Sequence, residues 1–126
     1  MSRPCWETRE ARDHGDFFRI THRPPTVEDF QSNREKGRDP MPTEIADPWE
    51  YAGISTFDSF DGAARKAREV GGRFGWYVTR IGVPEGAGAT GRCSPRTGHC
   101  TLGAPPGRSA AAFFWPLRMD TRPVPR

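Results

Sequence analysis

The stretch FFRITHRPP, residues 17–25, contains the first of three short motifs on which the predicted fold depends. Its apolar part predicts a short buried strand over 17–22, and Pro24-Pro25 end this strand because proline cannot donate to a sheet ladder. Arg19 lies inside the strand between apolar neighbours, where a guanidinium needs a carboxylate, phosphate or backbone acceptor. One interpretation is that Arg19 projects into a cleft and binds a ligand phosphate. The other is that it has a structural role, either facing the surface or pairing with an acid in the core.

The second motif is the pair Ser55-Thr56, which precedes the most regular helical pattern in the chain. Apolar and alanine residues recur at helical spacing over 59–70, charged residues fill the other side, and Gly71-Gly72 end the helix. Thr56 or Asp58 is a suitable N-cap. Because capping needs only one hydroxyl, the other is free to face a ligand or to orient a catalytic side chain.

The third motif is His99, which follows Gly98 at the end of a Gly/Pro-rich segment, 84–98, that we expect to be a mobile loop. An imidazole with an ordinary pKa can serve as acid, base or hydrogen-bond donor, and a glycine lets backbone approach a ligand closely. The alternative is a histidine with a structural role only. No acid lies near His99 in the sequence, so a metal site is not predicted.

The other segments predict a small mixed domain. A capping box at Thr26–Asp29 begins a short helix that Gly37 ends. The proline-rich connection 38–50 is expected to be irregular and to serve as a lid or binding loop. Strands are predicted at 75–83, 99–102 and 110–117. The glycine-rich run 86–91 is not taken as a dinucleotide-binding loop, because no helix follows it.

Composition favours one compact domain with a small aromatic core. Leu, Ile, Val and Phe account for only 19 of the 126 residues, but four Trp and two Tyr supplement them and the net charge is only +3. Aromatic side chains bury large areas, so such a core is feasible. We expect a flexible arm at 1–15, a single α+β domain at 16–119 and a flexible tail at 120–126.

The basic residues are almost all arginine, 17 against 2 lysines. This bias suits phosphate-bearing partners, but because the arginines are dispersed among 16 acids it also fits the codon bias of a GC-rich genome. Cys93 and Cys100 could form a bridge across a loop, but free thiols in a reducing cytoplasm are favoured for all three cysteines. No run is apolar enough for a signal sequence or a membrane span, which predicts a cytoplasmic protein without a membrane partner.

Together, the motifs resemble the catalytic domain of cholera-type and heat-labile-enterotoxin-type mono-ADP-ribosyltransferases. In that family an aromatic-Arg pair on a strand is followed by Arg-Pro-Pro, as in Phe18-Arg19 and Arg23-Pro24-Pro25. A Ser-Thr pair then precedes a helix and an apolar strand, as Ser55-Thr56 does. A late loop leads into a strand, a Gly/Pro turn and a final aromatic strand, and these places are filled by 98–102, 103–107 and 113–115.

The resemblance implies a small α+β domain in which two packed β-sheets, with two short flanking helices, surround an NAD cleft. It implies that Arg19 contacts the dinucleotide and that Ser55, with Thr56 beside it, helps to hold the nicotinamide ribose or the catalytic side chain. His99 lies about where the family keeps its catalytic glutamate, so it is the candidate catalytic residue. A histidine cannot supply the same negative charge to an oxocarbenium-like transition state. The domain is therefore degenerate, or has altered chemistry, or has its site elsewhere.

Two hypotheses follow. The first is a toxin-like bacterial or phage domain that binds NAD or a related phosphorylated nucleotide, with a protein or RNA as the target of any modification. The second is a non-enzymatic module that contacts a protein or nucleic acid through exposed aromatics or arginines. They differ in one structural expectation, because the second predicts that Arg19 and His99 lie far apart.

Overall fold

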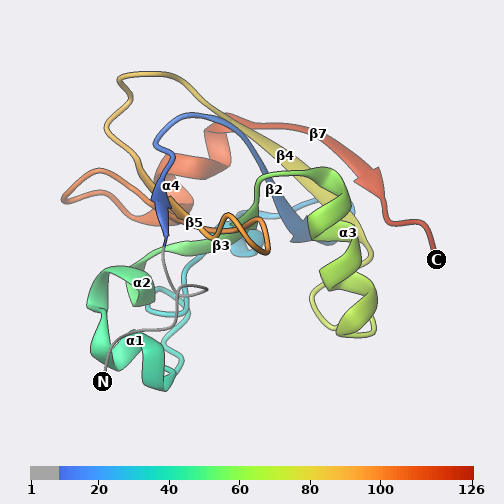
Figure 1. Cartoon of the computed structure of the whole chain (residues 1–126), viewed down its shortest axis with the longest axis horizontal. Helices are drawn as coiled ribbons and strands as arrows, with labels where there is room; N and C mark the ends of the chain where they lie inside the picture. Colours follow the sequence, from blue (N-terminus) through green and yellow to red (C-terminus); the bar gives the residue numbers. More distant parts are fainter. Residues whose placement is uncertain (1–8) are drawn as a thin grey trace.

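The computed structural model describes residues 9–126, and its centre is an antiparallel sheet of seven strands in the order β1-β5-β6-β3-β2-β4-β7 (Figure 1). This confirms the α+β class predicted from the sequence. The strands are β1 (Glu10–Ala11), β2 (Gly15–Thr21), β3 (Ile54–Phe57), β4 (Tyr77–Val83), β5 (Thr90–Cys93), β6 (His99–Gly103) and β7 (Arg118–Pro123). The helices are α1 (Pro42–Ala46), α2 (Pro48–Ala52), α3 (Phe60–Glu69) and α4 (Ala110–Phe114), with short 3-10 turns η2 (Val27–Phe30) and η3 (Trp115–Leu117).

The longest ladder of the sheet joins β2 to β4, from Gly15↔Val83 to Thr21↔Tyr77. Aromatic and β-branched residues predominate in both strands, as is typical of a pleated surface covered on both sides. The hydroxyls of Thr21, Thr79 and Thr121 bond in a row across β2, β4 and β7, with 2.8 Å between the oxygens of each pair. The row satisfies hydroxyl groups that would otherwise be buried without a partner.

The sheet is paired most weakly between β2 and β3, which meet at a single residue pair, Phe18↔Phe57. On one side of this junction lie β4 and β7, and on the other lie β6, β5 and β1. Arg19 follows directly after the junction on β2, and Ser55 lies two residues before it on β3. The finer division into two packed sheets stays a prediction, since the pairing joins all seven strands described.

Two hydrophobic clusters pack against the sheet. The first, with Phe17, Phe30 and Phe114 at 0% exposure, joins β2 to η2 and α4. The second lies beneath α3, whose three buried alanines at helical spacing pack beside Val78. The predicted α3 is confirmed, but its N-cap is Ser59, whose Oγ accepts the amide hydrogen of Gly62 at 3.1 Å.

Four segments differ from the sequence prediction. The helix expected from Thr26 to Gly37 is only the 3-10 turn η2, which ends at Phe30 and is followed by a turn. The connection 38–50 contains α1 and the start of α2, which each begin with a proline in the first turn, where the absent N–H is not needed. The expected loop 84–98 contains β5, which pairs along its length with β6. The expected strand 110–117 is α4 followed by η3, because Ser109 caps a run of three alanines. The described residues thus form four α-helices where two were expected.

Both ends of the described chain belong to the sheet. β1 lies within the expected arm 1–15 and pairs with β5, while β7 continues into the expected tail 120–126 and pairs with β4. Val124 follows β7 and is 5% exposed, and its amide bonds to the carbonyl oxygen of Trp76 at 2.8 Å. The folded unit therefore extends beyond the predicted bounds 16–119, and the first eight residues of the expected arm lie outside the described range.

Many of the arginines cover aromatic rings at the surface. The guanidinium carbon of Arg118 lies 3.5 Å from the ring centre of Trp115, that of Arg122 lies 4.0 Å from Phe60, and that of Arg92 lies 4.2 Å from Trp49. A guanidinium stacks on such a ring and stays in contact with water. The excess of arginine thus has a structural role, because guanidinium groups shield aromatic rings that would otherwise face water.

Candidate functional site

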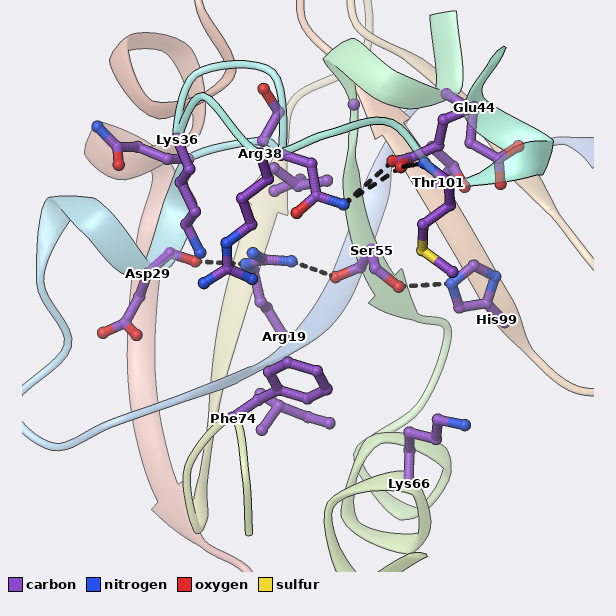
Figure 2. Close-up of a pocket in the computed structure, with 18 of the residues that line it drawn as sticks. Arg19, Asp29, Lys36, Arg38, Glu44, Ser55, Lys66, Phe74, His99 and Thr101 are labelled. Carbon is purple, nitrogen blue, oxygen red and sulfur yellow. Dashed lines mark hydrogen bonds between the residues drawn. The ribbon is translucent and has the colours of Figure 1, made fainter. Parts of the chain in front are cut away.

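A cavity of about 510 Å³ lies beside the β2–β3 junction. Its walls come from β2, η2, α1, α2, β3, α3 and β6, from the segment between η2 and α1, and from the turn before β4. The long connection predicted to be a binding loop therefore does line a cavity. Figure 2 shows Arg19, Ser55 and His99 in a row across it.

Arg19 is fixed by backbone carbonyls on two other segments. Its Nε donates to the carbonyl oxygen of Asp29 at 2.5 Å and its Nη1 to that of Ser55 at 2.6 Å (Figure 2). Desolvation by burial lowers the pKa of Arg19 to about 10, and the nearby charge of Asp29 opposes this shift. Arg19 therefore stays cationic at neutral pH and holds β2, η2 and β3 together.

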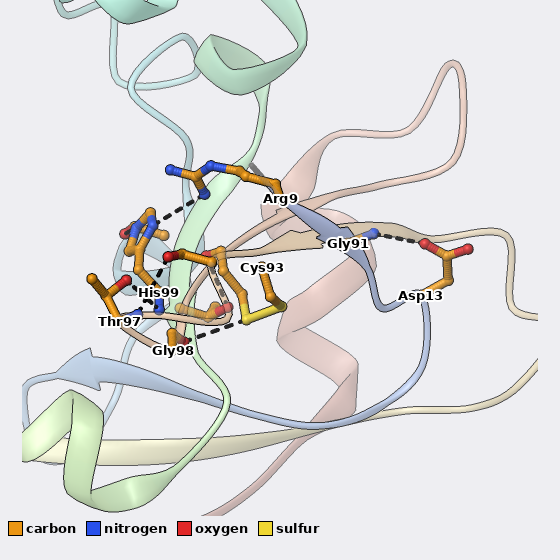
Figure 3. Close-up of a disulfide and its surroundings, with 11 residues drawn as sticks. Arg9, Asp13, Gly91, Cys93, Thr97, Gly98 and His99 are labelled. Carbon is orange, nitrogen blue, oxygen red and sulfur yellow. Dashed lines mark hydrogen bonds between the residues drawn. A yellow bond between two sulfur atoms is a disulfide. The ribbon is translucent and has the colours of Figure 1, made fainter. Parts of the chain in front are cut away.

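Ser55 and His99 meet through their side chains, with 2.5 Å between Ser55 Oγ and His99 Nε2. The contact follows from the β3–β6 pairing, which places the two strands side by side. The other ring nitrogen, Nδ1, lies 3.3 Å from a guanidinium nitrogen of Arg9 (Figure 3). Because a guanidinium only donates, Nδ1 is the acceptor and Nε2 carries the proton. His99 thus donates to Ser55, which leaves the Ser55 hydroxyl hydrogen free for another acceptor.

His99 is neutral at physiological pH. Burial lowers the pKa of His99 to about 4, with repulsion from Arg9 and Lys66 adding to the effect. A neutral imidazole whose Nε2 is already protonated cannot take the proton of Ser55, so the pair is not an activated nucleophile. His99 is placed to orient Ser55, and its predicted role as an acid or base is not favoured by this environment.

Thr56 does not line the cavity. It alternates with Ser55 along β3, is fully buried, and donates from Oγ1 to the carbonyl oxygen of Cys100 at 3.2 Å. Its predicted part in binding a nucleotide is therefore not supported by its position.

Gly98 was expected to let the backbone approach a ligand closely, but it packs against another part of the protein. Its close neighbour is Asp58, whose amide bonds to the Gly98 carbonyl oxygen at 2.9 Å, and a Cβ built on Gly98 would lie 2.6 Å from the Asp58 carboxylate.

Most of the charged residues of the cavity were not predicted from the sequence. Four cationic side chains besides Arg19 line it, as do two glutamates far from His99 in sequence: Lys36, Arg38, Lys66, Arg73, Glu44 and Glu50. Glu44 is 8% exposed and accepts from the side-chain amide of Asn33 at 3.1 Å and from the Met41 amide at 2.8 Å. The readable signal near Glu44 was Pro42, which suits the first turn of a helix.

His99 begins β6 beside a disulfide between Cys93 and Cys100, which lie directly opposite each other in the β5–β6 ladder (Figure 3). The preference for free thiols at these two positions was wrong, because the hairpin brings them into register. Such bonds are typical of oxidising compartments, and the cytoplasmic location stays a prediction. Cys5 lies outside the described residues.

Removing the disulfide is expected to destabilise the β5–β6 hairpin. In a Cys5→Ser background, the change Cys93→Ser/Cys100→Ser should lower the free energy of unfolding by about 1–2 kcal/mol, less than a long-range bridge, because the closed loop is short and the ladder remains. Urea denaturation with and without reductant measures this, and the double variant should be insensitive to reductant. Equal midpoints in all four samples would contradict the expectation.

Comparison with protein-family models, with curated proteins and with solved structures finds no match for this chain. Over residues 9–126, no cluster of three or more His, Cys, Asp or Glu side chains is suited to hold a metal ion. Within the same range, no helix has the length and apolar character needed to cross a membrane.

Proposed function

We propose that this chain is an ADP-ribosyltransferase-like domain that binds NAD or a related phosphorylated nucleotide in the 510 Å³ cavity. The observation that carries the proposal is the meeting of three motifs from distant parts of the sequence. Arg19 bonds to the Ser55 carbonyl oxygen, and His99 bonds to the Ser55 hydroxyl, all within one cavity. The family resemblance depends on these residues in this order.

The weak β2–β3 junction supports the finer part of the proposal, two sheets packed about a nucleotide cleft. Strands that share a single residue pair diverge on either side of it, and Arg19 and Ser55 lie near that point. The proposed cleft is the space into which these two strands open. In this arrangement Arg19 fixes the spacing of the two halves.

The charges of the cavity suit the two ends of a dinucleotide. Lys36 and Arg38 lie toward the end with Arg19, and Glu44 lies toward the end with His99 (Figure 2). Cations would meet the phosphates, while carboxylates and the free hydroxyl hydrogen of Ser55 would meet ribose hydroxyls. A neutral His99 does not replace the catalytic glutamate of the family. The cavity does contain carboxylates, because Glu44 and Glu50 both line it.

The structure does not meet the expectation that distinguished the alternative, a non-enzymatic module that contacts a protein or nucleic acid. It required Arg19 and His99 to lie far apart, whereas both contact Ser55. Three of the arginines also stack on aromatic rings, so these rings are partly covered and less available to a partner. Both observations favour the nucleotide proposal over the alternative.

Isothermal titration with NAD tests the proposal. We expect measurable binding to the unmodified protein and an affinity about tenfold weaker for Ser55→Ala, because the variant loses a hydrogen bond to the nucleotide and the partner of His99. Ser109→Ala is the matched control, since Ser109 caps α4 and does not line the cavity. Absence of binding to the unmodified protein by NAD, and by ADP-ribose, would overturn the proposal.

Transferase activity needs a separate measurement, the release of nicotinamide from NAD. Glu50→Gln and Glu44→Gln would reveal whether either cavity carboxylate acts in place of the missing glutamate. Release that survives both changes, and His99→Ala as well, would place any catalytic group elsewhere. No release by a protein that binds NAD would identify a binding domain.

A further inference from the structure

Three cationic side chains from two separate segments gather at one end of the cavity. Arg19 comes from β2, while Lys36 and Arg38 come from the turn that follows η2. Figure 2 shows the ammonium group of Lys36 and the guanidinium of Arg38 both pointing toward the guanidinium of Arg19. Like charges repel one another, so such a cluster is unfavourable unless an anion occupies it.

Arg19 cannot move away from this cluster. Two of its five N–H groups are committed to the carbonyl oxygens of Asp29 and Ser55, and the described residues give the others no partner. Its position is therefore set before any ligand arrives. Such a group can donate to a ligand without first losing conformational freedom.

The turn that carries Lys36 and Arg38 is fixed as well. The Glu35 carboxylate binds the amide of Ser32 at 3.2 Å and also the first free amide of α4, that of Ala110, at 3.0 Å. The Arg38 amide bonds to the Asn33 carbonyl oxygen at 3.0 Å, and the Arg38 carbonyl oxygen accepts from the hydroxyl of Tyr51. These bonds hold the backbone, so the two cationic side chains project from a fixed turn.

No carboxylate neutralises the two loop cations within the described part of the chain. Asp29 lies nearest, but its carboxylate bonds to His22 Nδ1 and to the Thr26 amide, both at 2.9 Å, and points away from the cluster (Figure 2). Desolvation by burial, followed by repulsion from Arg19 and Arg38, lowers the pKa of Lys36, and Asp29 and Glu28 only partly offset this. The cluster thus retains an excess of positive charge.

We propose that Arg19, Lys36 and Arg38 form a subsite for a diphosphate group. The inference rests on the proposed nucleotide function and adds where the diphosphate binds. Two guanidinium groups give directed pairs of donors to phosphate oxygens, and the ammonium adds a mobile charge. A diphosphate spans several cations and carries more charge than a monophosphate, so it matches a cluster of three better. The side with Ser55 and His99 is left for the sugar next to it.

Titration with inorganic pyrophosphate tests the subsite without the rest of a nucleotide. We expect the unmodified protein to bind pyrophosphate at low salt and at least tenfold more tightly than inorganic phosphate, with an affinity that falls as salt is added. The variant Lys36→Ala/Arg38→Ala should bind pyrophosphate at least tenfold more weakly. Arg65→Ala/Arg96→Ala removes two exposed cations outside the cavity and should bind within twofold of the unmodified protein.

The outcomes separate this subsite from the proposed function. Equal affinity for phosphate and pyrophosphate, or equal losses in the two double variants, overturns the diphosphate subsite. NAD binding that is unchanged in Lys36→Ala/Arg38→Ala overturns the subsite and leaves the proposed function intact. Pyrophosphate binding that depends on the three cations, in a protein that binds neither NAD nor ADP-ribose, supports the subsite and overturns the nucleotide function. A thermal melt of each variant confirms that it is folded.

Discussion

Arg19→Ala is expected to lower the free energy of unfolding by about 2–4 kcal/mol, because a hydrogen bond from a charged donor contributes about 1.5–3 kcal/mol and the variant loses two of them while repulsion from the neighbouring cations is relieved. Arg19 donates to carbonyl oxygens on two segments at 2.5 and 2.6 Å, and truncation would leave both without that donor. The loss would also enlarge the cavity beside the weakly paired β2–β3 junction. Urea denaturation followed by tryptophan fluorescence measures the change.

Two comparisons make this expectation specific to the bonds of Arg19. Arg19→Lys keeps the positive charge but cannot donate to both carbonyls, so it should recover less than half of the loss. Arg96→Ala removes an exposed arginine outside the cavity and should be neutral within about 0.5 kcal/mol. If Arg19→Lys were as stable as the unmodified protein, the charge alone would matter and the bridging role would be wrong.

Acidification is expected to destabilise the protein through His99. The pKa of His99 is about 4 in the folded state, because of burial and of repulsion from Arg9 and Lys66, and has an ordinary value of 6.5 when unfolded. Between these two values the unfolded state binds more protons, so stability rises with pH in that window. The stability is present above pH 6.5 and is lost as pH falls toward 4. After allowance for partial exposure, we expect a loss of about 2 kcal/mol.

Unfolding free energies measured from pH 7.5 to 4 test this expectation in the unmodified protein and in two variants. His99→Gln retains a hydrogen-bonding side chain without a titrating ring, so its stability should depend less on pH across the window. His14→Gln changes an exposed histidine and should leave the pH dependence unaltered. Identical pH profiles for His99→Gln and the unmodified protein would show that His99 is not the responsible group.

The same pKa bears on the chemistry of the site. At physiological pH His99 is neutral and donates from Nε2 to Ser55, so it adds no charge to the cavity. The carboxylates that line the cavity are those of Asp29, Glu44 and Glu50, and in the proposed function Glu44 and Glu50 would supply negative charge near a ribose. If the protein is a transferase, the candidate catalytic groups are therefore the carboxylates of Glu44 on α1 and Glu50 on α2, and not His99 on β6.

Local patterns predicted the parts of the fold that depend on neighbours in sequence. The spacing of alanines in α3, the capping box before η2 and the aromatic strand β2 were all readable, because each depends on residues within a few positions. The alanine-rich segment 110–114 was misread as a strand, although its alanines favour helix and Ser109 precedes them. The aromatic residues that follow favour a strand, and this local preference pointed to the wrong element.

Pairing between distant strands decided the features that local patterns could not. Cys93 and Cys100 form a disulfide because β5 and β6 place them opposite each other. Ser55 faces the cavity and Thr56 faces the core because side chains alternate along β3. The sequence of two adjacent hydroxyl residues does not show which side chain faces the cavity. The register of β3 in the sheet decides this.

Local patterns showed that Arg19 lies on an apolar strand, where a buried guanidinium needs acceptors from the protein or from a ligand. Local patterns also placed Ser55-Thr56 before a helix and His99 after a Gly/Pro-rich segment. Strand pairing brings Arg19, Ser55 and His99 together, and packing of the connecting segment against the strands adds Lys36, Arg38 and Glu44 to the same cavity. No local pattern could show this, because the surface against which the segment packs comes from strands far away in the chain.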